Sequence, residues 1–430
     1  MAATAHLFLA ANDGPEAVRK VSARAWLVFA LSFGLLLSDY MSRQVLAAVF
    51  PLLKADWALS DGQLGALAGA VALSVGILTV PLSWLADRIG RVRCVAAMAV
   101  TWSLATLACG LCASYGQMLA ARLVLGVGEA AYGSVGLAVV FTYFPRTLRG
   151  TITSAFMAGG LAGSFIGLAL GGATAERLGW RGAFTVMAVL GLALAVAYLA
   201  IVREVRTAPQ GSDSAAERTS GGASLSEAAH ALFGSAPLVL TYVGSGLQLF
   251  VLGALITWTP SLLNRAIGLS PQAAALAAAA LLLASGIGMV VCGGLSDRLS
   301  ADRPALRPWF AAAFGLVTVL ALEAALAAPL GPAQATAALV GLFVAGGTTG
   351  PAGAMVAEAT PPRFHGAALA VLTLANNLLG LAPGPAFTGR LADRIGLHAA
   401  LQVSVLAALF AAGAFALVAR LQKSTTDTGR

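Results

Sequence analysis

The chain has 430 residues, of which 59% are hydrophobic and 10% charged, and its mean hydropathy is +0.85. Because a transmembrane helix needs about 20 apolar residues, a chain this apolar is expected to be an integral membrane protein and not a soluble one. The net charge of +8 does not indicate a nucleic-acid partner, since the basic residues are dispersed among short loops.

A 20-residue apolar window along the chain predicts twelve helical spans, so we expect an all-α membrane protein. Helices satisfy their own backbone hydrogen bonds in lipid, and the alternating pattern of a β-barrel is absent. The expected spans cover approximately 24–50, 62–84, 94–113, 117–144, 150–175, 181–202, 236–262, 272–294, 306–328, 333–357, 364–389 and 397–420.

The longest polar stretch, 203–235, is rich in Ser, Gly, Ala and charge, and it divides the spans into six and six. We interpret it as a cytoplasmic linker between two six-helix bundles, 24–202 and 236–420. Residues 1–23 lack the apolar run of a signal peptide and are expected to form a cytoplasmic tail, as are residues 421–430.

The basic residues predict the orientation of these spans. If both termini are cytoplasmic, the cytoplasmic segments hold eighteen Lys and Arg, whereas the outer loops hold six, Arg265 among them. This bias is the one expected of membrane proteins with both ends inside the cell. The four cysteines fall in predicted helices, so no disulfide framework is expected. Short loops and few cysteines fit a bacterial inner membrane.

The two halves of the chain echo each other in sequence. Two sets of residues recur at similar offsets and at corresponding places in the order of spans, which indicates a duplicated half. Related halves around a central path are typical of secondary transporters that work by alternating access. Gly163, Gly167, Gly172, Glu176, Arg177 and Gly179 recur 217 residues later as Gly380, Gly384, Gly389, Asp393, Arg394 and Gly396, and Leu85, Asp87 and Arg88 recur 210 residues later as Leu295, Asp297 and Arg298.

Residues 83–91, between the second and third spans, resemble the G-x-L-A-D-R-x-G-R signature of the major facilitator superfamily, with Ser83 in place of the first Gly. The resemblance implies twelve helices in two pseudo-symmetric bundles, a monomer, and charges that latch the cytoplasmic ends. A generic charged loop is the alternative. The expected gate residues are Asp87, Arg88, Gly90 and Arg91, with Asp297 and Arg298 in a partial second copy.

Residues 122–132 look like the R-x-x-x-G-x-G-E-A-x-Y stretch of Spinster-type transporters, although anion:cation symporters share its G-E-A core. The first helix of that branch usually reads N-Y-x-D-R. Here Ser42 stands where the acid is expected, Arg43 is kept, and an acid lies three residues earlier at Asp39.

Four charged residues fall inside the first and fourth spans: Asp39, Arg43, Arg122 and Glu129. Ionisable groups in a membrane are costly and usually mark a pathway or a proton site. Helical rise places the two acids at one depth and the two arginines at another, so we expect one neutral cluster. Glu129 is the first candidate for proton coupling and Asp39 the second, because Arg43 and Arg122 stay charged. A permanent structural salt bridge is the alternative.

The second bundle carries no comparable charge, which suits an amphipathic solute better than a small polyanion. For each polar residue there, interhelical hydrogen bonding is the alternative to substrate contact. Glycines at 159, 163, 167 and 171 predict close helix packing in the fifth span, whose end approaches an antiporter motif without its Pro. The candidates for lining the substrate path are Tyr40, Tyr132, Gln248, Thr257, Trp258, Asn376 and Asn377.

The sequence therefore predicts a secondary transporter, expected to be proton-coupled, of an amphipathic solute. The resemblance to Spinster-type transporters implies that this solute is lysolipid-like or drug-like, with protons and membrane lipids as the other partners. An organic-anion/proton symporter of the same fold is the alternative, and a non-transporting membrane sensor is a second one. We expect no enzyme activity, no cofactor and no metal, because the spans show no nucleophile–base or His/Cys cluster and the chain has no G-x-x-x-x-G-K-[ST] motif.

Overall fold

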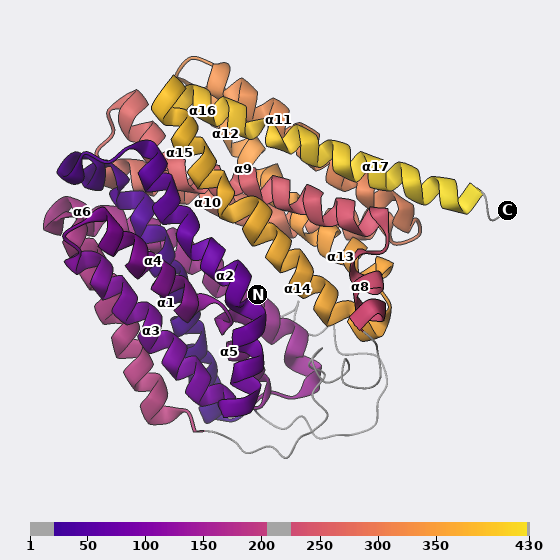
Figure 1. The fold of residues 1–430 in the computed structure, drawn as a ribbon, viewed down its shortest axis with the longest axis horizontal. Coiled ribbons are helices and arrows are strands. Elements are labelled where there is room, and N and C mark those ends of the chain that lie inside the picture. The colour runs from indigo at the N-terminus through magenta and orange to yellow at the C-terminus, as the bar shows by residue number, and fades with distance from the viewer. Residues whose placement is uncertain (1–20, 204–224, 428–430) are drawn as a thin grey trace, which may run out of the picture.

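The computed structural model describes residues 21–203 and 225–427 (Figure 1). Helices account for nearly all of these residues, as the hydropathy predicts. The first half holds α1 (Ala23–Trp57), α2 (Asp61–Ile89), α3 (Arg91–Leu111), α4 (Tyr115–Glu129), α5 (Tyr132–Phe141), η1 (Arg146–Leu148) and α6 (Arg149–Ile201). The second half holds α8 (Leu225–Phe233), α9 (Ala236–Ile267), α10 (Pro271–Ser300), η2 (Pro304–Leu306), α11 (Arg307–Ala327), α12 (Pro332–Ala345), η3 (Gly346–Thr348), α13 (Thr349–Ala359), η4 (Pro362–Phe364), α14 (His365–Ala375), the π-helical η5 (Asn376–Leu381), α15 (Pro383–Ile395), α16 (Leu397–Val405) and α17 (Ala407–Asp427).

Eleven stretches of the described chain are long and apolar enough to cross a membrane. One of them, α6, has 53 residues, which at 1.5 Å per residue would measure about 80 Å. A hydrocarbon core is only about 30 Å thick. The helix bends at Gly179, whose φ of 71° and ψ of 172° are not helical and favour glycine. It therefore crosses twice, which gives the twelve spans that the sequence predicts.

The helices of the two halves form two groups (Figure 1). They lie close together at one end, where α2 packs against α15 and α6 against α10, and they diverge toward the other end. We call these the closed end and the open end. The closed end holds the last turns of α1, α9 and α15 and the first turns of α2 and α10. The open end holds the last turn of α2 together with α8 and the start of α14.

Several predicted boundaries are wrong. Helix α1 continues through Pro51 to Trp57, and α9 continues to Ile267, so Lys54 and Arg265 lie in helices and not in outer loops. Part of the predicted linker forms α8, while residues 204–224 lie outside the described chain. Helix α17 extends to Asp427, into the predicted tail. Contacts with other parts of the fold determine where these helices end, and such contacts cannot be predicted from hydropathy alone.

The glycine ladder of α6 lies directly against α1, which confirms the predicted close packing. A side chain added at Gly163 would overlap the backbone carbonyl of Leu37, and one added at Gly167 would come within 2.7 Å of the Met41 Cα. The two helix backbones are in contact because these positions carry no Cβ. This contact fixes α1, which carries Asp39 and Arg43, within the first bundle.

Candidate substrate and proton site

A cavity of about 470 Å³ lies between the two bundles, near the middle of their helices. One wall is polar and comes from the first bundle, where Tyr40, Arg43 and Gln44 of α1 line the cavity. The facing wall comes from the second bundle and is mainly apolar. Its residues include Leu249, Leu252 and Ile256 of α9, Leu282 of α10 and Leu381 of η5.

The polar wall is organised by an ion pair between α1 and α4. The Arg43 guanidinium donates to Glu129 Oε2 from Nη2 at 2.6 Å and from Nε at 3.0 Å. The Glu129 side chain is fully buried, whereas the Arg43 side chain is 21% exposed. The pair therefore lies at the cavity wall, with its anion inside the bundle and its cation turned partly toward the cavity. The other Glu129 oxygen, Oε1, has no hydrogen-bond partner among the described residues.

Asp39 lies behind this pair, one turn earlier on α1, and it is buried. It lies close enough to Glu129 and Arg43 for both to act on it electrostatically. Its Oδ1 has no hydrogen-bond partner in the described part of the chain. Two carboxyl groups thus share one nearby guanidinium, and each keeps an oxygen that can hold a proton. Burial of a carboxylate without full compensation is costly, so these two carboxyl groups are candidates for a functional role.

Arg122 occupies a different environment from the one that a four-charge cluster predicts. The residue is 1% exposed, and its guanidinium donates to three backbone carbonyls: those of Leu67, Ser42 and Arg43, at 3.3, 3.3 and 3.4 Å. No carboxylate forms a salt bridge with it within the described chain, although Glu129 and Arg43 act on it electrostatically. Arg122 therefore holds α1 and α2 against α4, and it also contributes to the cavity lining.

The structure brings four of the predicted site residues to the cavity: Tyr40, Arg43, Arg122 and Thr257. Three other predicted lining residues are buried in packed helices instead. Tyr132 donates to the Ser32 carbonyl at 2.6 Å, Gln248 to the Ala345 carbonyl at 3.1 Å, and Trp258 to the Pro385 carbonyl at 3.0 Å. In this conformation these three side chains make interhelical hydrogen bonds, which is the alternative stated for Gln248.

Asn376 and Asn377 also differ from the prediction, since neither lines the cavity. Both lie in the π-helical turn η5, where Asn376 Oδ1 accepts from Ser245 at 2.7 Å and Asn377 donates to the Thr373 carbonyl. A π-helical turn leaves backbone groups less regularly paired and often occurs at functional sites. The amides stabilise this turn and join it to α9. Sequence reasoning instead missed Gln44 and Ser164, because neither carries charge.

The signature residues 87–91 and 297–298 lie at the open end. Arg88 stacks on Trp84 with its guanidinium carbon 3.4 Å from the ring centroid, and Gly90 joins α2 to α3 with a φ of 102° that favours glycine. Arg91 lines a second cavity, of about 890 Å³, between α2 and α5 of one bundle and α8 and α14 of the other. The side chain of Asp87 lies outside what the structure describes.

The second copy of the signature makes an ion pair within its own bundle. Arg307 contacts both Asp297, at 3.4 Å, and Glu358, while Arg298 is exposed. Of the predicted gate residues, Asp297 therefore pairs within the second bundle and Arg88 stacks within the first. The 890 Å³ cavity separates the bundles there.

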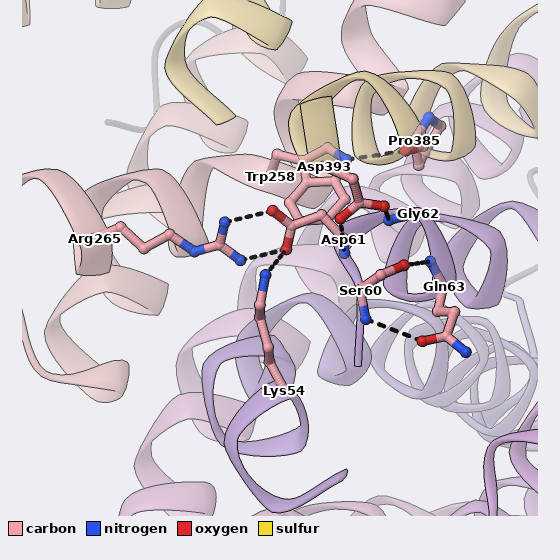
Figure 2. A network of polar contacts seen from close by, with 9 residues as sticks. All are labelled: Lys54, Ser60, Asp61, Gly62, Gln63, Trp258, Arg265, Pro385 and Asp393. Atoms are coloured by element: carbon pink, nitrogen blue, oxygen red, sulfur yellow. Dashed lines mark hydrogen bonds and ion pairs between the residues drawn. The ribbon is translucent and has the colours of Figure 1, made fainter. Parts of the chain in front are cut away.

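A second charged network, at the closed end, was not predicted (Figure 2). Asp61, at the start of α2, accepts from Lys54 Nζ at 2.5 Å and from both terminal nitrogens of Arg265 at 2.7 Å. Asp393 of α15 accepts from the backbone N–H groups of Asp61 and Gly62 at 2.7 and 2.9 Å. The sequence repeat pairs Asp393 with Glu176, but it does not reveal that Asp393 contacts α2.

Comparison with known proteins assigns the class. The model of the Major Facilitator Superfamily matches residues 32–385, which is most of the chain. The chain belongs to this superfamily, and its two bundles around a central cavity are those of a secondary transporter. It is therefore an integral membrane transport protein and not an enzyme.

Individual relatives show which members of the superfamily this chain resembles. The protein spinster of Drosophila melanogaster is 25% identical over 258 residues, which are 60% of this chain and 42% of that protein, so the match spans less than half of the relative. The gallate transporter of Pseudomonas putida is 27% identical over 66% of this chain and 68% of its own. A bacterial homologue of the human lysosomal transporter Spinster, solved in an inward-facing and unoccupied conformation, superposes with a TM-score of 0.83 and 21% identity over 93% of this chain and 98% of that one.

Proposed function

We propose that this transporter is proton-coupled and moves an amphipathic organic solute. The observation that carries the proposal is the buried Arg43–Glu129 pair, which lies in the wall of the central cavity with the carboxyl group of Asp39 behind it. Glu129 is the proposed proton carrier. A carboxylate that loses an adjacent guanidinium in a low-dielectric setting binds a proton more readily, so separation of the pair and proton uptake would occur together.

The cavity walls support an amphipathic solute. A polar group on the solute would meet Arg43, Tyr40 and Gln44, whereas an apolar part would lie against Leu252 and the other leucines of the second bundle. The cavity volume of about 470 Å³ lies within the range of small-molecule sites, about 300–1,000 Å³. The sequence resemblance to Spinster-type transporters implies a lysolipid-like solute within this class.

An organic-anion/proton symporter is the second candidate, and the gallate transporter of Pseudomonas putida is the relative that favours it. An anion would need a guanidinium that is free to bind it. In this conformation Arg43 is paired with Glu129, and the nitrogens of Arg122 donate to three backbone carbonyls. Anion binding would therefore require Glu129 to be protonated first, which frees Arg43. A carboxylate substrate and a proton would then enter together.

The open end, which carries the end of α17, is the proposed cytoplasmic side of a bacterial inner membrane. The excess of Lys and Arg in the segments assigned to that side supports this orientation. In this orientation the structure would be the inward-facing state.

The test is flux of a labelled lysophospholipid into proteoliposomes under an imposed pH gradient. We expect gradient-driven flux in the wild type that Glu129→Gln abolishes, with the variant still folded and inserted. Labelled gallate in the same vesicles tests the second candidate. Flux of gallate without flux of lysophospholipid would overturn the amphipathic substrate, and full coupling in Glu129→Gln would overturn the proton assignment.

A further inference from the structure

We infer that the charged network of Lys54, Asp61, Arg265 and Asp393 is a latch between the bundles, and that its release is a step of the transport cycle. The inference rests on alternating access by this superfamily and not on the proposed proton site. In Figure 2 the four side chains converge where α1 and α2 of one bundle meet α9 and α15 of the other. Asp393 and Arg265 are positioning residues of the cycle in this account, since neither lines the cavity.

The contacts of Asp61 cross the interface between the bundles. Its carboxylate is 5% exposed and makes a bidentate pair with Arg265 of α9, with both distances at 2.7 Å. Bidentate arginine–carboxylate pairs are among the stronger hydrogen-bonded ion pairs. Lys54 also donates to this carboxylate, but it comes from α1 in the same bundle as Asp61. Of these two contacts of the Asp61 carboxylate, the one with Arg265 must break when the bundles separate at this end.

Asp393 makes the reverse connection, from the second bundle to the first. Its two oxygens accept from the first two N–H groups of α2, at Asp61 and Gly62. These groups have no partner within their own helix, and an anion near a helix N-terminus is stabilised. Asp393 therefore completes the first turn of α2 only while the closed end is closed. On opening, that turn must find other partners.

Backbone contacts along the same interface show how closely α2 approaches α15. Side chains added at Gly65 and Gly69 of α2 would overlap the carbonyls of Pro385 and Ala382, and one added at Gly389 would overlap the Asp61 carbonyl. The absence of a Cβ at these positions lets α2 approach α15 closely enough for Asp393 to reach the α2 terminus. Glycines and charges thus act together at the closed end.

The first half of the repeat makes a weaker contact of the same kind as that of Asp393. Glu176, which the sequence repeat pairs with Asp393, accepts from the Gln272 N–H at 3.3 Å and from the Ser270 hydroxyl at 3.2 Å, at the start of α10 in the other bundle. An acid from each half therefore accepts from the beginning of a helix in the opposite half. The Glu176 contacts are longer, exposed and not reinforced by a bidentate arginine. The Asp393 side is accordingly the one that holds this end closed.

The test is the distance between spin labels on the two bundles in detergent or nanodiscs, without substrate or pH gradient. The labels are placed by Gly116→Cys and Leu330→Cys at the closed end and by Thr147→Cys and Ala301→Cys at the open end, after replacement of the four buried native cysteines. Arg265→Gln and Asp393→Asn should each raise the fraction of molecules with a long closed-end distance about tenfold, or ~1.4 kcal/mol. The open-end distance should shorten in the same molecules.

Two controls remove charge at the same end without crossing the interface. Lys54→Gln deletes the intrabundle donor to Asp61, and Asp56→Asn deletes a carboxylate whose partners, Trp180 and Arg181, lie in its own bundle. Both variants should leave the spin-label distances as in the wild type. Arg265→Lys keeps the positive charge and should shift the distances less than Arg265→Gln does. Wild-type distances in a folded Arg265→Gln, or equal shifts in Arg265→Gln and Lys54→Gln, would overturn the inference. The readout does not involve Glu129, so failure of the proton assignment would leave the result unchanged.

Discussion

The transporter has two charged networks, and they differ in how they lie relative to the two bundles. The central network of Asp39, Arg43 and Glu129 lies wholly within the first bundle, on α1 and α4. The closed-end network joins the bundles through Arg265 and Asp393. Rocking of the bundles breaks contacts between them directly, whereas a contact within one bundle separates only through a local change such as protonation or solute binding. The comparison therefore fits the proposed proton handling by the first network and the inferred conformational control by the second.

The largest expected effect comes from leaving the buried Glu129 without its cation. Arg43→Gln should lower the free energy of unfolding by about 3 kcal/mol, at the lower end of the range for broken buried ion pairs because Arg43 is partly exposed. Thermal unfolding in detergent measures this loss. The double variant Arg43→Gln/Glu129→Gln should recover part of it, because position 129 then carries no charge, while Asp39 still lacks the nearby guanidinium. A double variant no more stable than the single would contradict the central pair as described.

A bulky residue on the glycine face of α2 should separate the bundles without touching a charge. In Gly69→Val the new side chain meets the Ala382 backbone, and overpacking of this kind costs about 1–3 kcal/mol. Because the bundles can move apart, we expect this cost to favour molecules opened at the closed end, which the spin-label distances measure. Gly163→Val is the matched control: it meets the Leu37 carbonyl within the first bundle, so it should lower stability without changing the closed-end distance.

The smallest expected effect is that of the counterpart contact at Glu176. Glu176→Gln should change the population of the opened state by less than about fivefold, because exposed contacts of this type contribute about 0–1 kcal/mol. The same spin-label pair measures it. An effect as large as that of Asp393→Asn would show that the two halves share the latch equally, and the asymmetry argued from the contact distances would then be wrong.

The class of fold could be predicted from the sequence because the physics that sets it is local. Apolar runs long enough to cross a bilayer, and a polar break in the middle, indicate twelve helices in two groups. Helix ends could not be predicted, since Lys54 and Arg265 are charged residues that α1 and α9 nevertheless carry in their last turns. They are stabilised there by Asp61, which comes from another part of the chain.

The charged residues indicated the candidate site in the sequence. Their spacing along the chain could not predict which groups they would pair with. Helical periodicity places Asp39 and Arg43 on one face, yet the ion pair that forms is Arg43 with Glu129 on a neighbouring helix. Arg122 carries the same charge as Arg43 and has backbone carbonyls as partners. Hydrogen-bonding residues such as Gln248 and Trp258 could not be divided between cavity and core, because that division depends on how the helices rotate against one another.

Proton-coupled flux is the measurement that tests the central account most directly. Reconstituted wild type and Glu129→Gln are compared for uptake of labelled lysophospholipid with and without a pH gradient, and for exchange of the same solute at equal pH on both sides. We predict that the gradient accelerates uptake only in the wild type, while Glu129→Gln retains exchange because its cavity and its latch are intact. Equal acceleration of uptake in both proteins would contradict the assignment of Glu129 as the proton carrier.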